Sequence, residues 1–366
     1  MITLNAGACV RPLAKESSCT KCEVVCPTEA IQIGSHTLPS INYSLCVGCG
    51  ACDAICPSEA ISVDNFKPNE FFFEFLEDAS DLISCKKNVP CIASLSVEHT
   101  ISMAIFKKGL TFDMAHCKEC TIAHKCEKQI RDVAKEASYI LKAMGTEYKV
   151  DLRDVGYSSE ATEQISNRRE FFTHAKIEGI AKLKAEFEKE VQNATDELVK
   201  HSLSKSDIAL LRKKRLPTKK KLLFSAIKRT PKPEFYHVID ASAISFTSMK
   251  LLDQETCTAC QMCYRVCPTG ALYSDLKNSK IDLDPFLCIK CHTCHDVCEP
   301  DSLSISPSYE MEQFFEPKVI GLIKFRVRRC DECNLFFSSN SDDKLCYRCR
   351  AEEDEARELW GIKEPY

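Results

Sequence analysis

The spacing of cysteines is the feature of this sequence that could do chemistry. The chain has 25 cysteines in 366 residues, and eight of them form two runs of the pattern C-x2-C-x2-C-x3-C. These runs are Cys257, Cys260, Cys263 and Cys267, followed by Cys288, Cys291, Cys294 and Cys298. Two-residue loops let three thiolates surround one metal cluster, and the longer step begins a helical turn that carries the fourth cysteine to a neighbouring one. The spacing therefore predicts iron–sulfur clusters held by thiolates.

The N-terminal region carries a second, less regular copy of this pattern. One of its runs is complete, with Cys46, Cys49, Cys52 and Cys56, whereas the other has only Cys19, Cys22 and Cys26. We expect Cys9 to replace the missing first cysteine, with a longer loop after it. The phrase Pro27-Thr28-Glu29-Ala30-Ile31 after the first run is matched by Pro57-Ser58-Glu59-Ala60-Ile61 after the second and by Pro268-Thr269-Gly270-Ala271-Leu272 after the third. The repeat thus extends beyond the cysteines.

With these residues the chain resembles the bacterial two-[4Fe-4S] ferredoxin family in two copies, over roughly residues 1–66 and 233–310. As a whole it resembles the polyferredoxins that accompany formate dehydrogenases or hydrogenases. The resemblance implies that each run gives three thiolates to one cluster and the fourth to its neighbour. In the first module, Cys9, Cys19, Cys22 and Cys56 would bind one cluster, and Cys46, Cys49, Cys52 and Cys26 the other. In the second module the sets would be Cys257, Cys260, Cys263 and Cys298, then Cys288, Cys291, Cys294 and Cys267.

Three other uses of these cysteines are disfavoured. A disulfide scaffold is typical of small secreted chains, and the sequence shows no signal peptide. Structural zinc uses pairs of cysteine pairs rather than four cysteines in one run. The segment Cys288-Ile289-Lys290-Cys291-His292 has the form of a haem-attachment string, but the run continues at ferredoxin spacing. The chain departs from the ferredoxin pattern in the long loop after Cys9 and at Glu299, where proline is usual.

A different cysteine group lies in residues 67–128. We expect a small α/β segment, with a helix from Ser96 to Lys107 capped by Ser96 and a strand from Leu110 to Ala115. Short strands would bring together the cysteines at their ends, which are Cys85, Cys91, Cys117 and Cys120. These residues predict a possible fifth iron–sulfur cluster, with zinc or inert thiols as alternatives and Cys126 as a spare ligand.

Residues 129–232 are expected to form a helical, basic linker. Amphipathic helices are predicted over Ile130–Met144 and Ala175–Lys200, and their apolar faces suit either packing or a partner protein. Residues 200–232 contain twelve Lys or Arg and one acidic residue, Asp207. Such a stretch favours an acidic partner surface, anionic lipid or nucleic acid, or else a solvated linker. Nucleic acid is the least favoured of these because few aromatic residues are interleaved.

Residues 311–366 hold two CxxC pairs, Cys330 with Cys333 and Cys346 with Cys349, separated by twelve residues that include an expected strand over 335–337. This arrangement predicts a zinc ribbon with one zinc ion, and a rubredoxin-like iron site is the alternative. The acidic tail Glu352-Glu353-Asp354-Glu355 favours protein docking or a structural role over nucleic-acid binding.

Composition limits the remaining functions. Hydrophobic residues make up 44% of the chain, the formal net charge is −4, and no apolar stretch is long enough to span a membrane. Reduced thiols of this kind indicate a cytoplasmic location. With 11 glycines and no phosphate-binding loop, we expect no enzyme and no small-molecule substrate. The sequence thus predicts an α+β electron carrier with four [4Fe-4S] clusters that exchanges electrons with a redox enzyme or carrier protein. The alternative is a redox-sensing assembly or regulatory factor.

Overall fold

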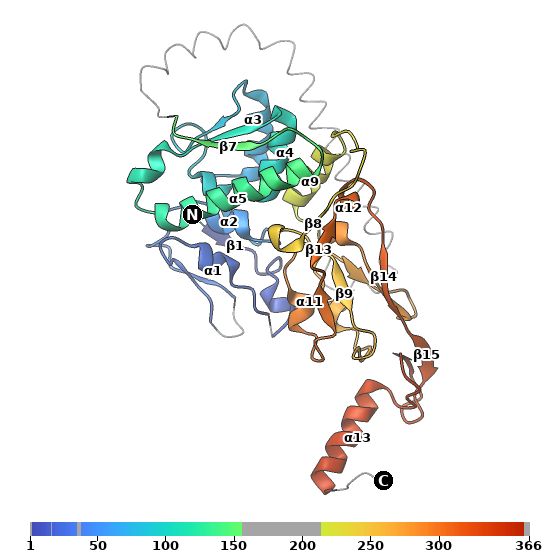
Figure 1. The fold of residues 1–366 in the computed structure, drawn as a ribbon. Coiled ribbons are helices and arrows are strands. Elements are labelled where there is room, and N and C mark those ends of the chain that lie inside the picture. The colour runs from blue at the N-terminus through green and yellow to red at the C-terminus, as the bar shows by residue number, and fades with distance from the viewer. Residues whose placement is uncertain (1, 16, 35–37, 156–213, 362–366) are drawn as a thin grey trace.

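The computed structural model describes residues 2–15, 17–34, 38–155 and 214–361 (Figure 1). Its N-terminal module repeats a strand, a short helix and a strand. The elements are β1 (Ile2–Leu4), α1 (Lys21–Val25), β2 (Ile31–Gln32), β3 (Ser40–Ile41), α2 (Ala51–Ile55) and β4 (Ile61–Val63). β1 pairs with β4 and β2 with β3, both antiparallel. Both helices end at the fourth cysteine of a run, because the proline that follows disfavours helical backbone at that position.

The second module repeats this order of elements. It contains β9 (Lys250–Leu252), α10 (Met262–Arg265), β10 (Leu272–Tyr273), β11 (Lys280–Leu283), α11 (Thr293–Asp296) and β12 (Leu303–Ile305). β9 pairs with β12 and β10 with β11. Beyond the expected end at residue 310, β14 (Ile320–Lys324) adds a third strand beside β11. A further pair, β8 (Val238–Asp240) with β13 (Ser308–Glu310), and helix α12 (Glu312–Phe315) complete this part.

An α/β unit lies between the modules in the sequence. Its parallel sheet has the order β5 (Leu82–Ile83), β6 (Leu110–Asp113) and β7 (Val150–Arg153), and its helices are α3 (Pro68–Glu77), α4 (Val97–Lys107) and α5 (Ala123–Ala143). The predicted N-cap is present, since the Ser96 side chain accepts a hydrogen bond from the His99 amide. The expected boundary between residues 128 and 129 falls inside α5. The apolar face of α5, with Ile130, Ala137 and Ile140, is buried in the core, so this amphipathic helix serves packing.

Helix α9 (Thr218–Ile227) corrects the expectation of a solvated or docking basic linker for this part of the chain. It packs against α4, and Leu223 and Ala226 are fully buried (Figure 1). Even two of its basic residues, Lys219 and Lys220, are buried, with exposures of 3% and 0%. The basic composition suggested an exposed stretch. It could not show that buried carbonyls elsewhere in the chain accept hydrogen bonds from these lysines. The helix predicted over 175–200 and the remaining basic residues up to 213 lie outside the described residues.

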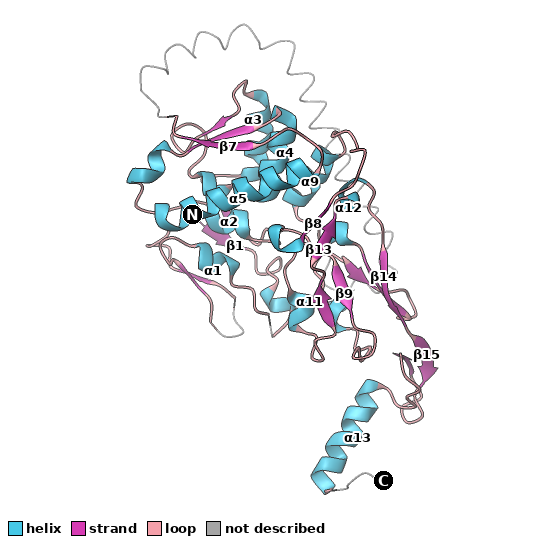
Figure 2. Ribbon diagram, viewed as in Figure 1, coloured by secondary structure: helices cyan, strands magenta, loops and turns pink. Residues whose placement is uncertain are grey.

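The C-terminal part extends from one end of the molecule (Figure 2). It consists of the hairpin β15 (Arg326–Arg329) and β16 (Phe336–Ser339), then helix α13 (Tyr347–Trp360). β16 confirms the strand expected between the two cysteine pairs. In the part of the chain that the structure describes, no helix has the length and apolar character needed to cross a membrane.

Candidate iron–sulfur and metal sites

Two cavities in the second module are lined by cysteines. The cavity that we name the interface cavity is lined by Cys267, Cys288, Cys291 and Cys294, together with Lys250 and His292. The one that we name the outer cavity is lined by Cys257, Cys260, Cys263 and Cys298. Each cavity takes three cysteines from one run and the fourth from the other run. These are the two ligand sets that the ferredoxin resemblance implies.

Left-handed backbone shapes the loops between the cysteines. Positive φ occurs at Ala259 (57°) and Gln261 (70°) in one run, and at Lys290 (47°) and His292 (66°) in the other. Non-glycine residues rarely adopt this conformation, so its recurrence marks a functional constraint. The corresponding positions of the complete run in the first module are Gly48 and Gly50, with φ of 67° and 77°.

Backbone amides also point at the sulfurs. The Lys290 N–H donates to Cys288 Sγ over 3.5 Å, and the Leu272 N–H donates to Cys267 Sγ over 3.5 Å. In the first module, the Ala60 N–H donates to Cys56 Sγ over 3.3 Å. Such bonds delocalise negative charge from a thiolate and are one of the means by which proteins set the potential of a cluster.

The first module brings Cys9 to the predicted partners. Burial, followed by the neighbouring thiols of Cys56, Cys19 and Cys9, raises the pKa of Cys22 to about 12. Burial, and then the charges of Cys49, Asp53, Cys26 and Cys22, raises the pKa of Cys52 as well. A metal cluster relieves this repulsion by replacing the protons of crowded thiols.

Arg11, which the sequence did not single out, holds the long loop after Cys9. Its buried guanidinium donates to the Ser17 carbonyl over 3.0 Å, the Cys19 carbonyl over 2.8 Å and the Gly34 carbonyl over 3.3 Å. The loop is thereby fixed to the start of the next cysteine run. This arrangement explains how a lengthened loop still delivers Cys9 beside Cys19.

The middle cysteines lie near one another at the end of the α/β unit. Burial, then the thiols of Cys91 and Cys85 and the charges of Glu127 and Cys120, raises the pKa of Cys117 to about 11. Cys126 on α5 is 2% exposed and lies between this group and the first module. It shares side-chain hydrogen bonds with Cys49 and with Cys91. The middle group is therefore in direct contact with a predicted ligand of the first module.

Four lysines donate to the backbone carbonyls of predicted ligand cysteines. The sequence alone did not predict these contacts. The distances from Nζ to the carbonyl oxygen are 2.8 Å for Lys125 to Cys26, 2.7 Å for Lys219 to Cys56, 2.6 Å for Lys214 to Cys267 and 2.9 Å for Lys220 to Cys288. The first three carbonyls belong to the fourth cysteine of a run. Carbonyls at the end of a helix lack a partner within it, so a cation is a favourable one.

The C-terminal cysteines form the tightest group. The sulfurs of Cys330, Cys333, Cys346 and Cys349 all lie within 4.8 Å of one another. Cys333 Sγ and Cys346 Sγ are 3.8 Å apart, which is about the edge of a tetrahedron whose centre lies roughly 2.3 Å from each sulfur, the usual Zn–S distance. The Cys346 N–H donates to Cys330 Sγ over 3.3 Å. The geometry suits one metal ion rather than a multi-iron cluster.

Two family models match parts of the chain. A 4Fe-4S dicluster domain matches residues 249–299, and the LdpA Fe-S cluster-binding domain matches residues 16–67. No curated protein and no solved structure matches the chain. The two matches cover the cysteine runs of both modules, and Cys9 lies just outside the second of them. The chain is therefore an iron–sulfur protein of the ferredoxin-like class, with cluster-binding domains in both halves of its sequence.

Proposed function

We propose that the protein is a polyferredoxin that binds four [4Fe-4S] clusters and passes single electrons to or from a redox enzyme, such as a formate dehydrogenase or a hydrogenase. The observation that carries this proposal is the exchange of the fourth cysteine between the two cavities of the second module. A zinc site has no need of this exchange, whereas a pair of neighbouring clusters does. We propose the same arrangement for the first module, with Cys9 as the additional ligand.

When bound, such clusters supply reversible one-electron chemistry at low potential. The chain itself provides the thiolates, and it stabilises their charge through backbone N–H donors and lysines. Leu252, Ile281 and Leu303 give the outer cavity an apolar part of its lining. We propose that the chemistry on a substrate belongs to the partner enzyme.

Two further metal sites belong to this proposal. Cys85, Cys91, Cys117 and Cys120 would hold a fifth iron–sulfur cluster next to the first module. Cys330, Cys333, Cys346 and Cys349 would hold one zinc ion in a zinc ribbon. Zinc has no redox chemistry of its own, so this second site would stabilise the C-terminal hairpin and its helix.

Metal analysis tests the proposal directly. Protein purified without oxygen should contain about sixteen iron atoms from the two modules and up to about four more from the middle group. Cys22→Ser and Cys263→Ser should each remove one cluster from its own module and leave the other module intact. Saturated protein with about eight irons or fewer would contradict the two-module proposal.

The alternative is a redox-sensing assembly factor that uses the C-terminal part to bind a maturing enzyme. Helix α13 gives this alternative some support, because Leu359 and Trp360 at its end are 82% and 75% exposed. Fast electron transfer to a purified redox enzyme would favour the carrier. Binding to an enzyme precursor without electron transfer would favour the assembly factor.

A further inference from the structure

Positive charge is concentrated on one side of the second module. Lys220 is fully buried, and its ammonium donates to the carbonyls of Cys288 over 2.9 Å and Phe246 over 3.2 Å. Lys214 donates to the Cys267 carbonyl over 2.6 Å. Cys267 and Cys288 both line the interface cavity. Two lysines that precede or begin α9 thus reach two different ligands of the same predicted site.

A third lysine lines the interface cavity itself. Lys250 is 4% exposed, and its Nζ lies 2.8 Å from His295 Nε2. His295 Nδ1 lies 2.9 Å from the Leu303 carbonyl, so this nitrogen carries the proton and Nε2 accepts from the ammonium. The pair therefore contributes one positive charge, on Lys250, beside Cys288 and Cys294.

Carboxylates offset this charge only in part. Among the described residues, Lys214, Lys220 and Lys250 form no salt bridge. The buried Glu98 and the half-buried Asp284 interact with Lys220 through charge alone. A buried cation without a close counter-ion is costly, and an anionic group in the cavity would compensate for it.

The outer cavity has the opposite environment. No charged side chain lines it. Acidic residues lie near two of its cysteines, since Asp253 acts on Cys257 and Glu299 follows Cys298 directly. The nearby cation Arg265, which donates to the side chain of Gln261 in the lining over 2.7 Å, is exposed to solvent. Glu299 accepts a hydrogen bond from the Tyr347 hydroxyl over 3.2 Å. The buried Lys220 and Lys250 thus lie beside the interface cavity, whereas Asp253 and Glu299 beside the outer cavity are exposed.

We propose that Lys220 and Lys250 make the cluster in the interface cavity the more easily reduced of the two in the second module. This inference rests on the proposed function and adds the order in which the two sites are reduced. Reduction adds one electron and no proton, so each site gains one negative charge. Cations in a low-dielectric interior stabilise that charge, while Asp253 and Glu299 oppose it at the outer cavity.

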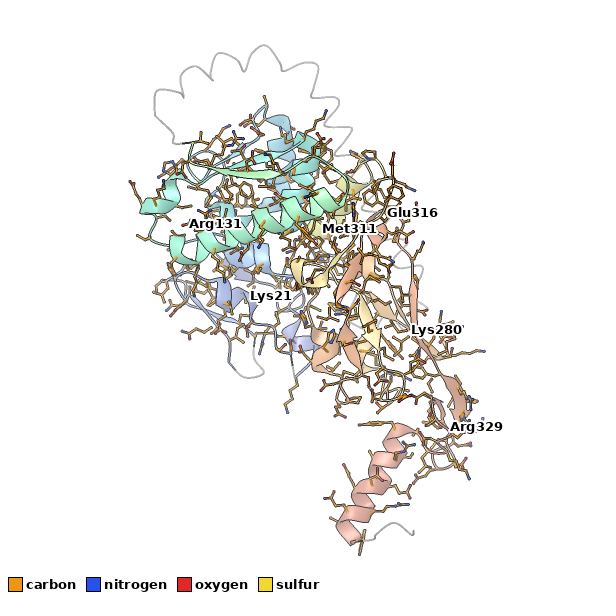
Figure 3. All side chains as sticks on the ribbon, viewed as in Figure 1. Lys21, Arg131, Lys280, Met311, Glu316 and Arg329 are labelled. Atoms are coloured by element: carbon orange, nitrogen blue, oxygen red, sulfur yellow. The ribbon has the colours of Figure 1, made fainter. Side chains whose placement is uncertain are left out.

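The interface cavity also faces the first module. The Ser18 amide and hydroxyl donate to the Asp296 carboxylate over 3.0 and 2.7 Å, and Lys21 Nζ donates to the Lys290 carbonyl over 3.3 Å. Lys21, labelled in Figure 3, comes from α1 and lies on the side that faces α11. An electron entering the second module would therefore be held next to the junction with the first.

A redox titration of the full-length, anaerobically purified protein tests this inference. Titanium(III) citrate serves as the one-electron reductant, and electron paramagnetic resonance follows each reduced site. Cys294→Ser and Cys263→Ser identify the signals of the interface and outer cavities by their loss. We expect the interface signal to appear at the higher potential in the parent protein.

Charge removal then tests the cause. Lys250→Met and Lys220→Met should shift the interface step to lower potential and leave the outer step in place. Lys228→Gln, at the residue that follows α9, is the control, because Lys228 is exposed and should shift neither step. If a methionine variant loses iron, Lys250→Arg and Lys220→Arg test the inference instead. These variants keep the positive charge and should retain both the iron and the parent potential.

The outcomes separate the inference from the proposed function. Methionine variants with full iron and unshifted steps would overturn the inference, as would an outer site that is reduced first. Arginine variants that restore iron but not the potential would also overturn it. The proposed function itself fails only if the parent protein shows no low-potential one-electron reduction or holds about eight irons or fewer.

Discussion

At the scale of single residues, Cys126 is the most informative thiol outside the predicted ligand sets. It lies between Cys49 and Cys91, and its hydrogen bonds with them, followed by burial, raise its pKa far above the usual range. The bond from Cys126 is also the main reason that the pKa of Cys49 is lowered to about 6. A protonated Cys126, whose single S–H is shared between these two sulfurs, is a link between two sites rather than a ligand of either.

Substitution of Cys126 tests this role. Cys126→Ser should keep the iron content of the parent, because a hydroxyl also donates to sulfur. Cys126→Ala should keep the iron as well but lower the potential of the neighbouring sites, since a donor is lost. Iron analysis and redox titration measure both effects, with Cys91→Ser as the comparison that should lose the middle iron. Loss of about four irons from Cys126→Ser would instead make Cys126 a ligand.

The residues that the sequence revealed and those it missed differ in the range of their interactions. The cysteine runs could be recognised because their ligand spacing is local. Arg11, Lys214 and Lys220 could not be recognised in this way. The two lysines donate to carbonyls that are distant in sequence, and Arg11 donates to carbonyls of the loop that it holds. A basic run such as Lys219-Lys220-Lys221 has the same composition whether it is solvated or buried, and only the tertiary structure decides.

At the scale of elements, the start of α2 depends on Gly50. Its φ is +77°, and a Cβ at this position would lie 2.7 Å from Ser94 Cβ. Gly50→Ala should therefore destabilise the first module by about 1–3 kcal/mol, through backbone strain and overpacking. Denaturation under anaerobic conditions measures this loss. Gly7→Ala is the control, because its nearest neighbour is the Asn5 side chain at 3.4 Å; equal stability of the two variants would contradict the argument.

Helix α5 carries a pH-sensitive contact with the second half of the chain. The Glu136 carboxylate accepts hydrogen bonds from the Ser245 amide over 2.6 Å and its hydroxyl over 3.0 Å. Burial nevertheless raises the pKa of Glu136 to about 7. The folded state therefore binds more protons than the unfolded state between the ordinary glutamate pKa of 4.5 and about 7, and this contribution to stability falls as the pH rises through that window.

Glu136→Gln should remove that pH dependence. The thermal midpoint of the variant should fall less than that of the parent between about pH 5.5 and 8, because glutamine stays neutral. Glu127→Gln on the same helix is the control, since Glu127 forms an exposed salt bridge with Arg131. Parallel pH curves for the parent and the Glu136 variant would show that this carboxyl does not govern the contact.

At the scale of the whole molecule, the C-terminal hairpin is attached to the outer cavity. The Asn340 side chain donates to the Cys257 carbonyl over 3.0 Å, and β14 joins the hairpin to the sheet of the second module. We expect one equivalent of zinc in the hairpin, which should remain after oxidation destroys the iron–sulfur clusters.

Cys330→Ser combined with Cys349→Ser should abolish zinc binding and leave the iron content unchanged, because these two cysteines line neither cavity of the second module. Metal analysis of the double variant and of the parent measures both. If the zinc content of the double variant is unchanged, the zinc is bound by the middle cysteines instead.

The overall organisation was predictable in its modules but not in their assembly. Repeats of the cysteine pattern located the two regions that match iron–sulfur domains, and periodicity located α4 and much of α5. The pattern does not show that α9, which is far along the chain, packs in the core beside α4. Burial of α9 depends on the complementarity of two distant surfaces, which hydrophobic periodicity alone does not specify.

The position of α9 also determines how the chain could be divided. The described N-terminal part, up to residue 155, lacks a helix of its own core, and residues 214–227 supply that helix before the chain enters the second module. Two polypeptides, 1–155 and 214–366, should therefore bind each other when produced together, as in fragment complementation. The same pair without residues 214–227 should bind much more weakly on a sizing column, because the packing of α9 against α4 is then lost.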